Sequence, residues 1–143
     1  MRFKSSQILS YMRFVALFIF MLTASALVSA RAEYSIADIP NVHLSDSTRY
    51  VSDPEGILSP TAVKELDGKL GGIWRATSAE PVVVVIDRAD TDDLDTYATE
   101  LFESWGIGKK DKDNGLLILI SRDQRRAVIR TGQGVEGLIP DAV

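Results

Sequence analysis

The chain has 143 residues, with 16 basic and 20 acidic residues, one histidine and no cysteine. Without cysteine, neither a thiol nucleophile nor a disulfide framework is available. A net charge of −4 also excludes nucleic acid as an expected partner, because binding to phosphates is driven by clustered cations.

The first 32 residues are typical of a secretory signal peptide. They combine basic residues, an apolar run and a small-residue end, namely Arg2, Lys4, Arg13, residues 14–28 and Ala30-Arg31-Ala32. The apolar run is shorter than the roughly 20 residues that span a bilayer, so cleavage is favoured over the alternative of a membrane anchor or tether. An exported protein without cysteine must be stable without disulfides, so we predict that the exported chain resides in the periplasm or cell envelope of a bacterium.

Cleavage would leave a more acidic protein. Residues 1–32 carry four of the basic residues and none of the acidic ones, which leaves 12 basic and 20 acidic residues and a net charge of about −8. Such a surface suits cations or partners that carry them. Residues 33–48 are polar and aperiodic, and are predicted to form a linker or N-terminal arm in which His43 is solvated. Residues 49–143 suffice for one domain.

Two helices and three strands are predicted in the domain. Ser59 and Pro60 supply a helix start, and apolar residues at helical spacing continue it to Ala76. A second helix begins near Thr91 and Asp92 and ends at Trp105, where Gly106 can terminate it. Strands are predicted at residues 81–86, 116–120 and 126–131.

The order of these elements predicts the fold class. A strand, helix and strand of this length form a right-handed parallel crossover, and residues 126–131 return as an antiparallel arm. We therefore expect a three-layer α/β/α sandwich with a mixed, mostly parallel central sheet. Pro140 begins a third helix that Val143 interrupts, so the C-terminal helices are expected to be truncated.

Two loops resemble ligand-binding motifs. Residues 105–115 lie between a helix and a buried strand, where α/β sheets position binding loops, and they include Asp113 and Asn114. They do not form an EF-hand, because position twelve is Arg122, although an irregular oxygen-ligand site remains open. Residues 132–137 have the glycine spacing of a dinucleotide fingerprint but lack its crossover context, so we predict a glycine-rich turn and no nucleotide.

Several segments, in the same order, resemble the TPM domain family, which includes thylakoid-lumen proteins of photosystem II repair and bacterial envelope proteins. Residues 53–59 are similar to the family's opening Asp-x-x-Gly-x-Leu-Ser. The other matching segments are residues 101–108, residues 113–119, and Arg130, Gly132, Gly134, Glu136, Gly137, Pro140 and Asp141. The resemblance implies an exported α/β/α domain that assists the assembly or maintenance of membrane-associated complexes.

The resemblance also implies a divalent-cation site, with calcium as the expected ion. The matching ligands are Asp53, Asp113, Asn114 and Asp141, which would meet at one end of the sheet. A metal-assisted acid phosphatase that uses the same loops, with Asp113 as candidate catalytic residue, is one alternative function. A purely structural interaction domain, in which the acids only cap helices and turns, is another. The residues alone do not decide between the three.

Overall fold

A computed structural model describes residues 8, 12, 13, 15 and 32–135. The predicted third helix at Pro140 and the candidate ligand Asp141 lie outside the described residues, as does most of the predicted signal peptide. No helix among the described residues is long and apolar enough to cross a membrane.

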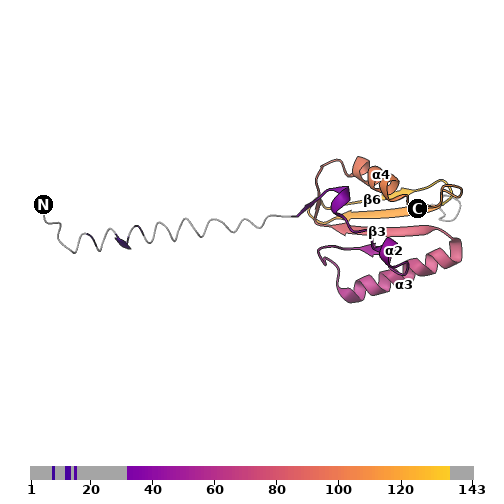
Figure 1. The fold of residues 1–143 in the computed structure, drawn as a ribbon, viewed down its shortest axis with the longest axis horizontal. Coiled ribbons are helices and arrows are strands. Elements are labelled where there is room, and N and C mark those ends of the chain that lie inside the picture. Colours follow the sequence, from indigo (N-terminus) through magenta and orange to yellow (C-terminus); the bar gives the residue numbers. More distant parts are fainter. Residues whose placement is uncertain (1–7, 9–11, 14, 16–31, 136–143) are drawn as a thin grey trace. The chain divides into compact units, whose positions relative to one another are not determined.

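The described part of residues 31–143 forms an α/β sandwich (Figure 1). Its elements in chain order are β1 (Glu33–Tyr34), a 3₁₀ helix (Ile36–Asp38), α2 (Val42–Ser45), β2 (Val51–Ser52), α3 (Pro60–Thr77), β3 (Glu80–Ile86), β4 (Arg88–Ala89), α4 (Leu94–Trp105), β5 (Gly115–Ser121) and β6 (Arg126–Thr131). The predicted helices and strands are confirmed to within a few residues at each end. The short elements β1, β2, β4 and α2 were not predicted, because two to four residues are too few to show a period.

Four strands form the main sheet in the order β2-β3-β5-β6. β2, β3 and β5 are parallel, and β6 pairs with β5 in the antiparallel direction. The predicted mixed, mostly parallel sheet is therefore present. A second, two-stranded sheet joins β1 to β4.

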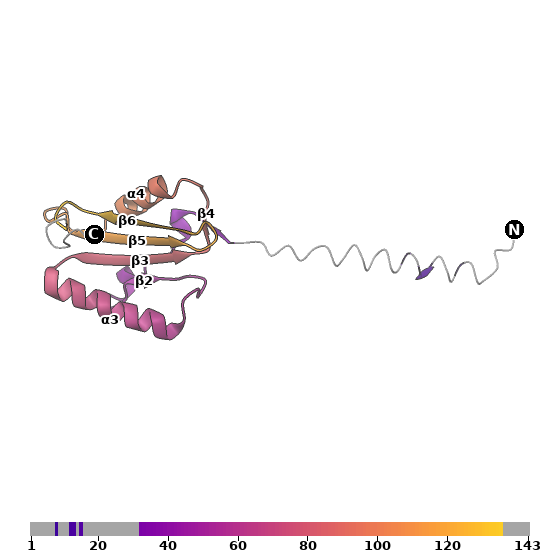
Figure 2. The same cartoon turned by 180° about the vertical axis from the view of Figure 1, so that it is seen from behind.

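Alternate residues of β3 build two separate cores. Val82, Val84 and Ile86 pack with the buried face of α4, whereas Val83 and Val85 pack with α3. Since successive strand residues point to opposite faces, the two helices must lie on opposite sides of the sheet. Figures 1 and 2 show α3 and α4 on these opposite sides.

This arrangement limits the handedness of the crossovers. From β2 through α3 to β3, and from β3 through α4 to β5, the chain moves in the same direction across the sheet but uses opposite faces. Two such connections have opposite hands. The right-handed rule, which holds for almost all parallel crossovers, can hold for only one of them.

The helix ends follow the sequence signals, with one correction. Ser59 caps α3 by accepting a hydrogen bond from the backbone N–H of Ala62, and Pro60 occupies the first helical position. The cap of α4 is Asp93 rather than Thr91 or Asp92, because its carboxylate accepts from the backbone N–H of Thr96 at 3.1 Å. Gly106 ends α4 in the left-handed conformation, as predicted.

The N-terminal arm packs on the domain. Ile39 is only 4% exposed within the α4 core, and Ser52 donates a hydrogen bond to the carbonyl of Pro40 at 2.7 Å. His43 is half-buried, with Nδ1 2.8 Å from the carbonyl oxygen of Arg49 and its ring centroid 4.9 Å from that of Tyr50. The prediction that His43 is simply solvated was therefore wrong.

Candidate functional site

The three parallel strands give the sheet two distinct ends. We call the end where β2, β3 and β5 begin the amino edge, and the end where they finish the carboxyl edge. Residues 105–115 lead into the first residue of β5 and so lie at the amino edge. Ligand-binding loops of open α/β sheets are expected at the carboxyl edge, so this loop is on the opposite side from the one that the rule favours.

Asn114 is a structural residue of the amino edge. It is 5% exposed, its Oδ1 accepts from the backbone N–H of Lys109 at 2.8 Å, and its Nδ2 donates to the carbonyl of Ser78. Its own carbonyl accepts from the backbone N–H of Glu80 at 2.7 Å. The side chain thus joins the starts of β3 and β5, and the amide oxygen predicted to bind a cation is already occupied.

Asp113 joins the same loop to the glycine-rich turn. Its Oδ2 accepts from the backbone N–H of Gln133 at 2.8 Å, and its carbonyl accepts from the backbone N–H of Gly134 at 2.8 Å. A Cβ added to Gly132 or Gly134 would collide with backbone atoms of Asp113 or Lys112. These two glycines therefore allow close contact between the turns, which confirms their interpretation as turn residues.

Asp53 has a similar role at the other end of the sheet. Its carboxylate accepts from the backbone N–H groups of Ile57 and Leu58 at 2.9 and 2.8 Å, and Gly56, directly before Ile57, has a φ of 64°. The Asp-x-x-Gly-x-Leu-Ser segment is therefore a closed turn followed by the Ser59 cap of α3. In this segment, the residues that resemble the family are therefore those that form a turn and begin a helix.

Strand register separates Asp53 from Asp113. Ser52 of β2 pairs with Val84 of β3, which in turn pairs with Leu119 of β5. Leu119 is four residues beyond Gly115, the first residue of β5. Asp53 and Asp113 lie beyond these positions in opposite directions, so the separation exceeds about 13 Å at roughly 3.3 Å per residue. Calcium ligands must lie within about 2.6 Å of one ion, so these two residues cannot share a cation.

The described residues also contain no group of three acidic or histidine side chains placed to hold a metal ion. The proposed cation site is therefore not assembled from Asp53, Asp113 and Asn114, and the position of Asp141 is outside the described residues. Oxygens of all three described candidates accept hydrogen bonds from backbone N–H groups in loops at opposite edges, and calcium binding stays a prediction.

Charged side chains at the carboxyl edge pair with one another. Arg88 forms ion pairs with Glu33, Asp92 and Asp123, and Nε of Arg122 lies 2.8 Å from Oδ1 of Asp87. The contact with Asp87 raises the pKa of the Arg122 guanidinium. These pairs neutralise much of the charge at this edge.

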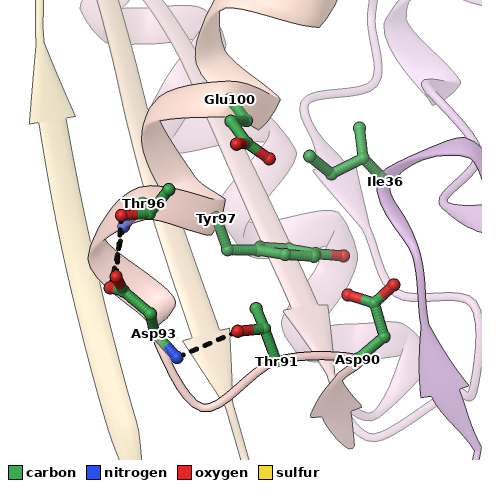
Figure 3. A pocket seen from close by; sticks show the side chains of 7 residues that line it. All are labelled: Ile36, Asp90, Thr91, Asp93, Thr96, Tyr97 and Glu100. Atoms are coloured by element: carbon green, nitrogen blue, oxygen red, sulfur yellow. Dashed lines mark hydrogen bonds between the residues drawn. The ribbon is translucent and has the colours of Figure 1, made fainter.

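A cavity of about 570 Å³ also opens at the carboxyl edge, beside the first turns of α4 (Figure 3). Asp93 and Thr96 in its wall bond to each other as a helix cap, and the backbone N–H of Asp93 donates to Oγ1 of Thr91. Tyr97 donates its hydroxyl proton to the carbonyl of Tyr34, and burial raises the pKa of this phenol. Helix capping accounts for most of these polar contacts.

The amino edge carries a different kind of cavity. An open cavity of about 530 Å³ and a smaller one of about 140 Å³ share His43, Tyr50, Trp74 and Glu80 in their walls. We call the two together the amino-edge groove. Trp74 from α3 is 45% exposed, and Trp105 from the end of α4 lines the smaller cavity. The groove thus collects aromatic rings from both helix layers.

Three charged side chains of this groove are unpaired. Glu80, Arg75 and Lys109 line it, and their charged groups have no ion pair or hydrogen bond with any other residue in the described part of the chain. Sequence reasoning missed these residues. Trp74 is one of the apolar residues at helical spacing in the first predicted helix, and the signal that could have identified it is its position on the last turn, three residues before the helix ends.

The fold and the two edges define an α/β sandwich domain in which the loop acids Asp53 and Asp113 bind backbone N–H groups and an aromatic, charged groove opens at the amino edge. The model of the TPM domain matches residues 51–143, and the chain belongs to this family. A solved relative is the solution NMR structure of the N-terminal domain of a protein from P. gingivalis, with 37% sequence identity and a TM-score of 0.67. The match covers 74% of this chain and 68% of that one. No curated protein matches the chain.

Proposed function

We propose that this TPM domain is an exported docking domain that binds a partner in the amino-edge groove. In this proposal it assists the assembly or maintenance of membrane-associated complexes in the cell envelope, as the family resemblance implies. The observation that carries the proposal is the presence of unpaired Glu80, Arg75 and Lys109 beside an exposed Trp74. Aromatic residues and arginine are enriched at protein interfaces, and charges without internal partners are available to a second molecule.

The arrangement of the amino edge supports docking more than catalysis. Asn114 and Asp113 hold the loops behind the groove through hydrogen bonds to backbone groups, so the binding surface is built on fixed elements. Rigid surfaces lose little conformational freedom on binding. Calcium binding and phosphatase activity stay predictions of the family resemblance, and no contact among the described residues favours either.

Site-specific photocrosslinking in the cell envelope tests the proposal. A photoreactive phenylalanine analogue replaces Trp74 in one version of the full chain and Lys64, on the first turns of α3, in the control. We expect one discrete crosslinked product from the Trp74 position, which weakens when Arg75→Glu is added. Equal products from both positions, or a product that Arg75→Glu leaves unchanged, would contradict docking in the groove.

Export is tested separately by cell fractionation. The full chain should be recovered from the periplasm or envelope as a shortened protein, whereas a chain that begins at Glu33 after an added methionine should stay in the cytoplasm. Recovery of both proteins in the same fraction would contradict the role assigned to residues 1–32.

A further inference from the structure

The smaller cavity of the amino-edge groove has an aromatic wall. His43, Tyr50, Trp74 and Trp105 line it, and they come from α2, the residue before β2, the last turn of α3 and the end of α4. The hydrogen-bond contact between Nδ1 of His43 and the carbonyl of Arg49, together with a tilted ring contact with Tyr50, positions the histidine ring. The faces of aromatic rings carry negative potential and attract cations that lie within about 6 Å.

Glu80 adds a negative charge to this wall. It is the one carboxylate among the described residues that line the smaller cavity, and neither lysine nor arginine is among them. The backbone N–H of Glu80 is bound by the carbonyl of Asn114, so the start of β3 is fixed while the carboxylate remains unpaired in the described part of the chain. Rings and carboxylate together form a site suited to a positively charged group.

The larger cavity adds the opposite charge. Arg75 and Lys109 line it next to the four shared residues, and both are unpaired among the described residues. Asp67 is also in this wall, but its Oδ1 accepts from the backbone N–H groups of Tyr50 and Val51 at 2.7 and 3.1 Å. The groove therefore has a cation-binding part beside an anion-binding part.

We propose that the groove recognises a peptide segment of the partner through a lysine or arginine side chain, held between the aromatic rings and against Glu80. A carboxylate next to that side chain in the same segment binds Arg75 and Lys109. This inference rests on the proposed function, because both place the partner in the amino-edge groove. The negative charge of residues 33–143, about −8, also favours a partner that brings a cation and opposes contact with an anionic membrane surface.

Short peptides test this recognition directly. The probe is acetyl-Gly-Lys-Asp-Gly-amide, added to the exported chain while the indole N–H signals of Trp74 and Trp105 are followed by NMR. Replacing the lysine of the probe by the neutral, similarly long norleucine should weaken binding about tenfold, as expected for loss of a cation–aromatic contact and an ion pair. Replacing the aspartate of the probe by asparagine should weaken it about threefold.

Two variants of the protein assign the contacts. Glu80→Gln should weaken the lysine peptide about fivefold and leave the norleucine peptide unchanged. Arg75→Gln should reduce the difference between the aspartate and asparagine peptides, because Lys109 is the one cation that remains for the carboxylate among the described residues that line the groove. Glu100→Gln, in the wall of the carboxyl-edge cavity, is the matched control and should change nothing, because that cavity shares no lining residue with the groove. Neither Glu80 nor Arg75 makes a side-chain hydrogen bond within the described residues, so both variants are expected to fold.

The outcomes separate this inference from the proposed function. Equal binding of the lysine and norleucine peptides, or a Glu80→Gln protein that binds as well as the original, would overturn the recognition chemistry. If the Trp74 crosslink nevertheless persists, docking in the groove stands without it. Perturbation of the indole signals by phosphatidylethanolamine vesicles but by none of the peptides would replace the peptide with a lipid headgroup and also overturn the inference.

Discussion

At the two edges of the sheet, the charged side chains named above make different contacts. At the carboxyl edge, Arg88 and Arg122 pair with neighbouring carboxylates, and Glu55 accepts a hydrogen bond from the backbone N–H of Asp87. At the amino edge, backbone contacts and one buried asparagine hold the loops, while Glu80 and the nearby cations stay unpaired among the described residues. A rule that places ligands at the carboxyl edge of α/β sheets would therefore select the edge whose charges already serve the fold.

The largest expected effect concerns the close contact between turns at the amino edge. Gly134→Ala should lower the free energy of unfolding by about 3 kcal/mol or more, because the new methyl group would collide with the carbonyl oxygen of Lys112. Urea unfolding measures the change. Gly72→Ala, within α3, is the control. A Cβ there meets no atom within 4 Å, so the variant should gain up to about 1 kcal/mol from its helix propensity. Equal stabilities would refute backbone packing as the basis of this edge.

Asn114→Ala should have the next largest effect, a loss of about 2 kcal/mol. The variant removes the buried Asn114 side chain that partners the backbone N–H of Lys109 and the carbonyl of Ser78 in partly buried hydrogen bonds. Thermal unfolding, and the amide exchange rate of Lys109 measured by NMR, would show it. Asn114→Asp is the informative companion, because it keeps the acceptor for Lys109 but places a carboxylate oxygen against the carbonyl of Ser78 in place of the donor. A variant that is more stable with Asp than with Asn would instead indicate a site that prefers a charged ligand oxygen.

Much of the fold was predictable because its long elements have strong periods. The β-branched run of β3 and the apolar spacing of α3 and α4 each extend over several residues. The site was not predictable in the same way. Asp53 follows a strand and Asp113 precedes one, which places them at opposite edges, but β2 has only two residues and gives no signal of its own. Without β2, the direction of the chain at Asp53 could not be assigned.

The amino-edge groove was missed for a related reason. His43 lies in the N-terminal arm and Tyr50 directly precedes the short strand β2. The contacts of this part of the chain are set by tertiary structure, since Ile39 packs in the α4 core. Trp74 and Trp105 occupy apolar positions of amphipathic helices, where the pattern predicts burial. Only the ends of the helices relative to the sheet show that Trp74 reaches the surface. The sequence thus identified the elements more reliably than the places where they meet.

A double-mutant cycle compares the two acidic loops directly. Asp53→Ala and Asp113→Ala should each lower the free energy of unfolding by about 1.5 kcal/mol, because each removes the acceptor for backbone N–H groups. The effects should add within about 0.5 kcal/mol, both with calcium and with a chelator, since the residues lie at opposite edges. A coupling that appears only with calcium would restore the shared cation site. Loss of phosphomonoester turnover in Asp113→Ala alone would support the phosphatase alternative.

The smallest expected effect is a pH dependence at the carboxyl edge, where Asp95 at the start of α4 meets the two arginines of β6. Hydrogen bonds from Arg130 and then Arg126 lower the pKa of Asp95. A carboxylate whose pKa is lower in the folded protein contributes stability above its unfolded pKa of about 3.9, and this contribution disappears as the pH falls through the folded value. Asp95→Asn should therefore be less stable than the original protein at pH 6, and the difference should vanish toward pH 2. Glu100→Gln, whose carboxylate has no ion pair within the described residues, should show no such convergence in urea unfolding measured across this range. If the free energies of unfolding of Asp95→Asn and the original protein differ by the same amount at every pH, packing rather than ion pairing joins α4 to β6. The two edges of the sheet would then be held by the same kind of contact.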